Sequence, residues 1–182
     1  MSRLLIVINM LNDFCNKRGV LATSPITGKM YAKPIINPVK EVIDEARSNR
    51  NFIAWLVDAH TENDKEFDRF PVHAIKETWG SQIINELNPE LINESIPETL
   101  IEKTRYSGFY NTSLNSLLKI TVPAEVIVLG VCTSICIMDT VSGLANRDYN
   151  TVIMKDCVAD FDPEAHKSAL ARMEGLYGAK IV

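Results

Sequence analysis

The sequence has no cluster of basic residues, no long apolar segment and no closely paired cysteines. Its 19 Lys and Arg are interspersed among 23 Asp and Glu, so the net charge of -4 predicts no nucleic-acid partner. The longest apolar runs, LLIVI and VIVLGV, are far shorter than the roughly 20 residues of a membrane helix. No charged leader precedes a signal-type segment. These absences predict a cytoplasmic protein with no membrane partner.

The four cysteines do not follow the C-x-x-C spacing of zinc or thioredoxin-like sites. They are Cys15, Cys132, Cys136 and Cys157. Free thiols in a reducing compartment are the simplest interpretation, and a thiol oxidoreductase is disfavoured. Cys132 and Cys136 would share a helix face only if both were helical, which we do not expect.

The chain of 182 residues is expected to form one domain, residues 1–182, with one sizeable core. Short apolar runs alternate with helical patterns, which is typical of βαβ units and a parallel sheet. The expected strands are Arg3–Ile8, Phe52–Val57, Thr99–Lys103, Glu125–Gly130, Thr151–Lys155 and the terminal KIV. The expected helices are Pro38–Ser48, Asn111–Leu118, Thr133–Arg147 and Pro163–Tyr177.

In open parallel sheets the ligand site lies at the carboxyl ends of the strands. The residues that directly follow the expected strands are Asn9, Asp58, His60, Lys103 and the loop 130–136. This topological argument alone makes them the candidates for a site.

Cys136 and Lys103 are the candidates for nucleophilic chemistry. Cys136 falls near the start of the helix that follows LGVCTS, where the helix dipole favours a thiolate. An ammonium group at Lys103 would stabilise that thiolate further. The alternatives are that Cys136 is a small buried apolar residue and that Lys103 is a solvated charge.

The segment after the second strand is a candidate metal site. Asp58, His60, Glu66 and His73 all lie in it, and imidazole and carboxylate groups suit zinc, manganese or iron. Their irregular spacing leaves open the alternative that no metal is bound. His166 is expected on the solvated side of the last helix and is given no role.

Four stretches in the same order carry a resemblance over almost the whole chain. IVINMLNDF, DAH with the later FPVHAIKETWG, IEKTRYSGFYNTSL and LGVCTSIC together resemble the isochorismatase-like cysteine hydrolases. The resemblance is to their nicotinamidase and N-carbamoylsarcosine amidase branch. It implies a doubly wound α/β fold with a mostly parallel six-stranded sheet and helices on both faces, and a small-molecule amide as substrate.

The resemblance also implies the roles of individual residues. Cys136 would be the nucleophile and Lys103 the lysine of a Cys, Asp and Lys triad. The backbone amides of Cys132 and Cys136 would form the oxyanion hole, with a cis peptide between Val131 and Cys132. Retention of the cysteine argues against a true isochorismatase.

Further implications concern the metal, the pocket and the assembly. The metal site of nicotinamidases maps onto Asp58, His60 and His73, with Glu66 as the fourth ligand, whereas the sister amidases work without it. No organic cofactor is implied. Aromatic pocket residues map onto Phe14, Phe70 and Tyr106, where a planar ring would stack; core packing is the alternative, above all for Phe70. Homo-oligomers, dimers or larger, are expected.

The sequence departs from the family pattern at Asn9, where the triad aspartate is expected. An amide keeps hydrogen bonds but cannot relay a proton, a role that contributes roughly 100- to 10,000-fold. We expect thiolate formation to survive and breakdown of the tetrahedral intermediate to become limiting. Ser134 and Glu77 also depart from the pattern, where an acidic residue and glycine are common.

Two classes of function follow. The first is hydrolysis of a small amide, foremost nicotinamide to nicotinate and ammonia, with N-carbamoylsarcosine or another ureido acid as the runner-up. The second is a non-catalytic homologue that binds its ligand without turnover. A laboratory substitution, a natural change in a weakened enzyme and a binding protein all remain open as explanations of Asn9.

Overall fold

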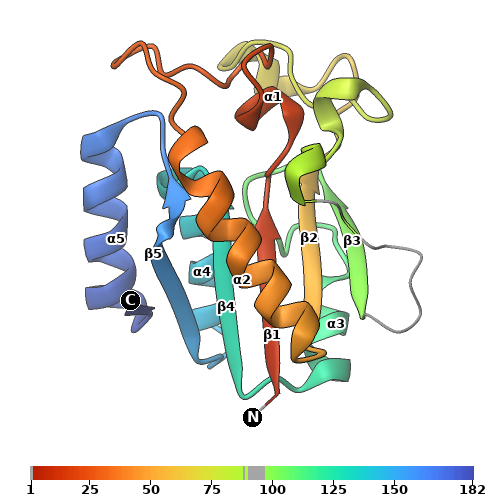
Figure 1. Cartoon of the computed structure of the whole chain (residues 1–182), viewed down its shortest axis with the longest axis vertical. Coiled ribbons are helices and arrows are strands. Elements are labelled where there is room, and N and C mark those ends of the chain that lie inside the picture. Colours follow the sequence, from red (N-terminus) through yellow and green to blue (C-terminus); the bar gives the residue numbers. More distant parts are fainter. Residues whose placement is uncertain (1, 88, 90–96) are drawn as a thin grey trace.

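A six-stranded sheet, parallel throughout, organises the molecule, and its strands follow the order β3-β2-β1-β4-β5-β6 (Figure 1). It is seen in a computed structural model that describes residues 2–87, 89 and 97–182. The strands are β1 (Arg3–Ile8), β2 (Phe52–Asp58), β3 (Glu98–Lys103), β4 (Glu125–Val131), β5 (Thr151–Ala159) and β6 (Lys180–Ile181). The α-helices are α1 (Asn12–Cys15), α2 (Ile36–Ser48), α3 (Leu114–Thr121), α4 (Met138–Ala145) and α5 (Pro163–Tyr177).

Helices cover both faces of this sheet, as expected for a doubly wound fold. Helix α2 packs on one face with Leu5 and Val7 of β1, while α3, α4 and α5 pack on the other with Leu4 and Ile6 (Figure 1). Successive residues of β1 therefore enter two separate apolar layers. This explains why the strand is apolar at every position instead of at alternate ones.

The order of strands reverses between β1 and β4, and this is where the site lies. Chain connections run from β1 to β2 and β3 on one side, and from β4 to β5 and β6 on the other. Gly130 in β4 has φ +113°, and a Cβ there would meet the Ile8 carbonyl oxygen at 2.0 Å. Glycine is therefore required for β4 to lie this close to the end of β1.

The six expected strands are confirmed, but some helix boundaries differ. Asn111 has φ +51°, so the helix expected from it begins only at Leu114. The helix expected at Thr133–Arg147 divides into a π-helical turn, Thr133–Ile137, and α4. Strand β5 continues to Ala159 past an irregularity in its pairing with β4, instead of ending at Lys155.

Short 3₁₀ turns occupy parts of the connections. They are Lys33–Ile35, Lys65–Asp68, Trp79–Ser81 and Asn85–Leu87. Within the residues described, no helix combines the length and apolarity needed to cross a membrane.

Candidate active site

Four side chains from four neighbouring segments meet at the carboxyl edge of the sheet. Asn9 follows β1, Asp58 ends β2, Lys103 ends β3 and Cys136 lies in the π turn after β4. The Lys103 ammonium lies 3.4 Å from the Cys136 sulfur and also donates to Asp58 Oδ1. Asn9 Nδ2 lies 3.6 Å from the same sulfur. The structure thus brings the side chains at these strand ends together in a buried polar cluster.

Asp58 gives this cluster a carboxylate that the sequence argument had assigned only to the metal site. It pairs in register with Lys103, and its Oδ2 accepts a hydrogen bond of 2.5 Å from Asn9 Nδ2. Its backbone N–H donates to Asn9 Oδ1 at 3.0 Å. A carboxylate therefore adjoins both donors of the thiol, because Asp58 lies between the amide and the lysine.

Burial is the largest influence on the acidity of Cys136. Removal from water raises the pKa of the Cys136 thiol to about 12, although the Lys103 ammonium opposes this change and Asp58 adds to it. Burial also disfavours the Lys103 ammonium, but Asp58 and Cys136 together raise the pKa of Lys103 above its ordinary value. The expected low thiol pKa is contradicted, since a thiolate forms at Cys136 only against its desolvation cost.

The turn that carries the thiol is held by Asp160, which the sequence argument missed. The backbone N–H and the hydroxyl of Ser134 donate to Asp160 Oδ2 at 2.7 and 2.8 Å. The Val131–Cys132 peptide is cis, at the bond that the resemblance indicated. Cys132 has an extended conformation before the turn, so it does not share a helix face with Cys136.

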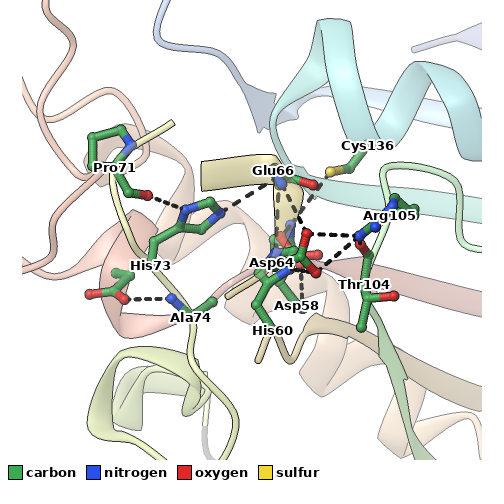
Figure 2. A network of polar contacts seen from close by, with 12 residues as sticks. Asp58, His60, Asp64, Glu66, Pro71, His73, Ala74, Thr104, Arg105 and Cys136 are labelled. Carbon is green, nitrogen blue, oxygen red and sulfur yellow. Dashed lines mark hydrogen bonds and ion pairs between the residues drawn. The ribbon is translucent and has the colours of Figure 1, made fainter. Parts of the chain in front are cut away.

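A second cluster, of metal-ligand type, adjoins the first (Figure 2). Asp58, His60 and His73 each offer a ligand atom, and these atoms lie within 4.8 Å of one another. Glu66 Oε1 lies 4.0 Å from His60 Nε2 and 3.8 Å from His73 Nε2. His60 Nε2 is buried without a hydrogen-bond partner. A divalent ion fits this donor set and would satisfy the buried nitrogen.

Hydrogen bonds at the Nδ1 atoms aim both imidazoles at this position. His73 Nδ1 contacts the Pro71 carbonyl at 2.7 Å, and His60 Nδ1 contacts Asp64 Oδ2 at 3.2 Å. A proton held on Nδ1 leaves Nε2 as a lone-pair donor, as a metal requires. Burial also lowers the pKa of His73, which favours its neutral, metal-binding form.

Asp64 and Arg105 form an outer shell that the sequence argument did not identify. Arg105 Nη1 donates to both oxygens of Asp64 at 2.9 and 3.0 Å, and the Glu66 N–H donates to Asp64 Oδ1 at 2.9 Å (Figure 2). Although burial opposes ionisation, these bonds and His60 lower the pKa of Asp64 to about 2. The spacing of Asp64 four residues after His60 was the available signal. Arg105 gave no signal in the sequence, because its partner Asp64 lies 41 residues away in the chain.

The two clusters open into one cavity of about 430 Å³. Cys136 lies on its wall together with Asp58, Glu66 and His73. Phe14, Phe70 and Tyr106, the three predicted aromatic residues, also line the cavity. Phe14 meets the His73 ring edge to face at 5.5 Å. The space is large enough for one small planar molecule between the thiol and the ligand cluster.

Two residues on the periphery need comment. His166 is half-buried and its Nδ1 lies 2.9 Å from Thr133 Oγ1, so the expectation of a solvated surface histidine is wrong. Glu77 has φ +66°, a left-handed conformation that glycine adopts without strain. This conformation accounts for the glycine that the family pattern carries at the position.

The fold and site together define a doubly wound α/β protein with a buried cysteine, a lysine and a ligand cluster in one cavity. The family model described as the isochorismatase domain matches residues 3–182. The chain therefore belongs to the isochorismatase family, whose hydrolases act on the carbon–nitrogen bonds of amides.

Two relatives in sequence cover most of the chain. The isochorismatase family protein PncA of Bacillus subtilis, described as uncharacterized, is 35% identical over 186 residues, which span 100% of this chain and 99% of the relative. A probable inactive nicotinamidase of Arabidopsis thaliana is 30% identical over 182 residues, or 94% and 88% of the two chains.

Three solved structures share the fold over all of this chain. Nicotinamidase PncA from Bacillus subtilis superposes with a TM-score of 0.90 at 30% identity over 99% of its own length. N-carbamoylsarcosine amidase from Thermoplasma acidophilum has a TM-score of 0.84 at 28% identity over 95% of its length. A zinc complex of pyrazinamidase from Pyrococcus horikoshii has a TM-score of 0.86 at 26% identity over 99% of its length.

Proposed function

We propose that the chain acts on the carboxamide of a small nitrogen-containing aromatic ring, with nicotinamide as the substrate and nicotinate and ammonia as products. The proposal depends on one observation: a single cavity with aromatic walls is lined by Cys136 and by Asp58, His73 and Glu66 of the ligand cluster. The ring would stack against Phe14 or Tyr106 while its carboxamide reaches the thiol. Similarity to nicotinamidase PncA of Bacillus subtilis supports this choice.

The protein groups would divide the work as follows. Lys103 would stabilise the Cys136 thiolate, whose sulfur attacks the amide carbon. As the carbon–sulfur bond forms, the negative charge moves from sulfur to the amide oxygen. The backbone amides of Cys132 and Cys136 would receive the oxyanion. Ammonia then leaves, and water hydrolyses the thioester to the free acid and regenerates the thiol. Asn9 cannot deliver the proton that ammonia needs, so this departure would be the slow step.

Zinc, iron or manganese would be held by Asp58, His60, His73 and Glu66, and when bound would supply a Lewis-acidic position for the nitrogen of the ring. The chain's own residues prepare that position. Asp64 and the Pro71 carbonyl orient the two imidazoles, and Glu66 lies beside both Nε2 atoms.

A ureido acid is the second candidate, and Arg69 is the observation that favours it. Arg69 is an exposed member of the cavity lining, to which Tyr106 also belongs. A guanidinium at this rim would pair with the carboxylate that a ureido acid carries and nicotinamide lacks. Similarity to N-carbamoylsarcosine amidase supports this alternative.

The test is ammonia release from nicotinamide, pyrazinamide and N-carbamoylsarcosine by the zinc-loaded chain and its Asn9→Asp variant. We expect Asn9→Asp to turn over nicotinamide roughly 100- to 10,000-fold faster than the native chain. Asn16→Asp is the matched control, because Asn16 lies outside the cavity lining and uses only its oxygen, which accepts from the Arg18 N–H. Preference for N-carbamoylsarcosine that Arg69→Gln abolishes would select the second candidate.

If Asn9→Asp is silent on every amide while nicotinamide still binds by calorimetry, the protein is a binding homologue and the hydrolase proposal fails. Elemental analysis gives an independent check. A metal-free protein with full amidase activity would count against nicotinamide.

A further inference from the structure

The orientation of the Asn9 side chain is determined by its neighbours. Its Oδ1 accepts the Asp58 backbone N–H at 3.0 Å, so its Nδ2 must face Asp58 Oδ2 at 2.5 Å and the Cys136 sulfur at 3.6 Å. A flipped amide would oppose oxygen to the carboxylate and NH₂ to the N–H, and would lose both bonds. Asn9 is fully buried, so no water compensates for such a loss. The amide therefore presents only a donor to the sulfur.

In the part of the chain that the structure describes, the side chains that hydrogen-bond the Cys136 sulfur are all donors, and none is an acceptor. Lys103 Nζ at 3.4 Å and Asn9 Nδ2 at 3.6 Å are those two side chains. The Asp58 carboxylate contacts both donors, Oδ1 with Lys103 and Oδ2 with Asn9. This arrangement can stabilise a thiolate once formed, but neither side chain that bonds the sulfur in the described structure is a carboxylate that could carry a proton to a leaving group.

We propose that this chain selects acyl donors by their leaving group: Cys136 accepts acyl groups from esters and thioesters, and retains the acyl group as a long-lived thioester. The proposal rests on the nucleophilic role of Cys136 in the proposed function, and not on the identity of the acyl group. It follows from the one-sided hydrogen bonding of the sulfur, because an aryl oxide or a thiolate departs as an anion, whereas ammonia departs only after receiving a proton.

The chemistry balances without any further reactant. Solvent hydroxide removes the proton of the Cys136 thiol, and the resulting thiolate forms a bond to the acyl carbon. The carbon–oxygen bond of an ester, or the carbon–sulfur bond of a thioester, then breaks, and the aryl oxide or thiolate leaves with the electron pair. With an amide, the same intermediate expels the thiolate again in preference to the much more basic amide ion. Hydrolysis of the thioester then needs water to lose a proton, and Asn9 cannot accept it. The acyl-enzyme therefore accumulates.

The first test uses the native chain and 4-nitrophenyl acetate, an ester that does not depend on the ring-binding wall. We expect a burst of one equivalent of 4-nitrophenolate per chain, followed by slow turnover, with acetate on Cys136 identified by mass spectrometry. Across aryl acetates the acylation rate should fall steeply as the phenol becomes more basic. Cys136→Ser is the control for spontaneous hydrolysis and for acylation elsewhere.

The second test compares the ratio of ester to amide rates between variants. The ratio compares the rate of the 4-nitrophenolate burst with the rate of nicotinamide turnover. The native ratio should exceed that of Asn9→Asp by about 100- to 10,000-fold, while Asn16→Asp keeps the native ratio. In Asn9→Asp two carboxylates would meet at Asp58, which can prevent folding. In that case the series of aryl acetates on the native chain still tests the proposal.

Three results would overturn the proposal. The first is an acylation rate that does not depend on the basicity of the phenol, and the second is ester turnover without a burst. The third is nicotinamide turnover by the native chain at a rate within tenfold of that of Asn9→Asp. This third result would assign the proton relay to Asp58. Failure of the proposed function is distinguishable, because the acetate burst would then persist while Asn9→Asp hydrolyses none of the amides.

Discussion

Replacement of Asp64 by asparagine is expected to weaken zinc binding about 10- to 100-fold, the usual effect of removing an outer-shell partner of a ligating histidine. Asp64 Oδ2 lies 3.2 Å from His60 Nδ1, and a carboxylate at this distance favours the tautomer with the proton on Nδ1. An asparagine could still accept from the Glu66 N–H, but its NH₂ would then face His60 Nδ1. That favours the tautomer with the proton on Nε2, the buried nitrogen that faces the ligand cluster.

The expected loss corresponds to about 1.4–2.7 kcal/mol of binding free energy. Zinc affinity would be measured by competition with a chromophoric chelator, and thermal unfolding would confirm that the variant folds. Asp68→Asn is the matched control, because Asp68 is exposed at the end of the 3₁₀ turn that Asp64 caps, and its replacement removes the same charge. Zinc affinity of Asp64→Asn within twofold of the native value, or an equal loss in Asp68→Asn, would refute the reasoning.

Other consequences follow from the site and the backbone. Because burial raises the pKa of Cys136 to about 12, its alkylation by iodoacetamide should accelerate about tenfold per pH unit from pH 7 to 10, and a plateau below pH 9 would contradict this. Glu77→Gly should raise the free energy of unfolding in urea by about 1 kcal/mol, because φ is +66°, while Glu77→Gln should not. Zinc at a hundredfold excess over its Kd should raise the free energy of unfolding of the native chain by about 2.7 kcal/mol, measured by calorimetry. The same zinc concentration should not stabilise the His73→Ala variant.

Much of the fold was predictable, because it depends on local patterns. Strands buried on both faces are apolar at every position, and β1 and β2 were recognised on that basis. Pro163 after Asp162 marked the start of α5, where the Asp162 side chain accepts the N–H groups of Glu164 and Ala165. The prediction was least accurate for the helix after β4, since a π turn has no local sequence signature.

The membership of the site was predictable as well, because parallel strands deliver their carboxyl ends to one edge. Asn9, Asp58, Lys103 and Cys136 were all candidates before any geometry was available. The sequence also showed that an amide stands where a carboxylate was expected. These conclusions need only the order of residues and the rule that places ligands at strand ends.

Only the tertiary structure decided how those groups act on one another. The parallel register of β2 and β3 places Asp58 beside Lys103, and Asn9 turns its NH₂ towards both Asp58 and the sulfur. Burial then raises the thiol pKa, which the position of Cys136 near a helix start had suggested would fall. Register, side-chain orientation and desolvation arise from contacts between residues far apart in the chain, so no local pattern in the sequence encodes them.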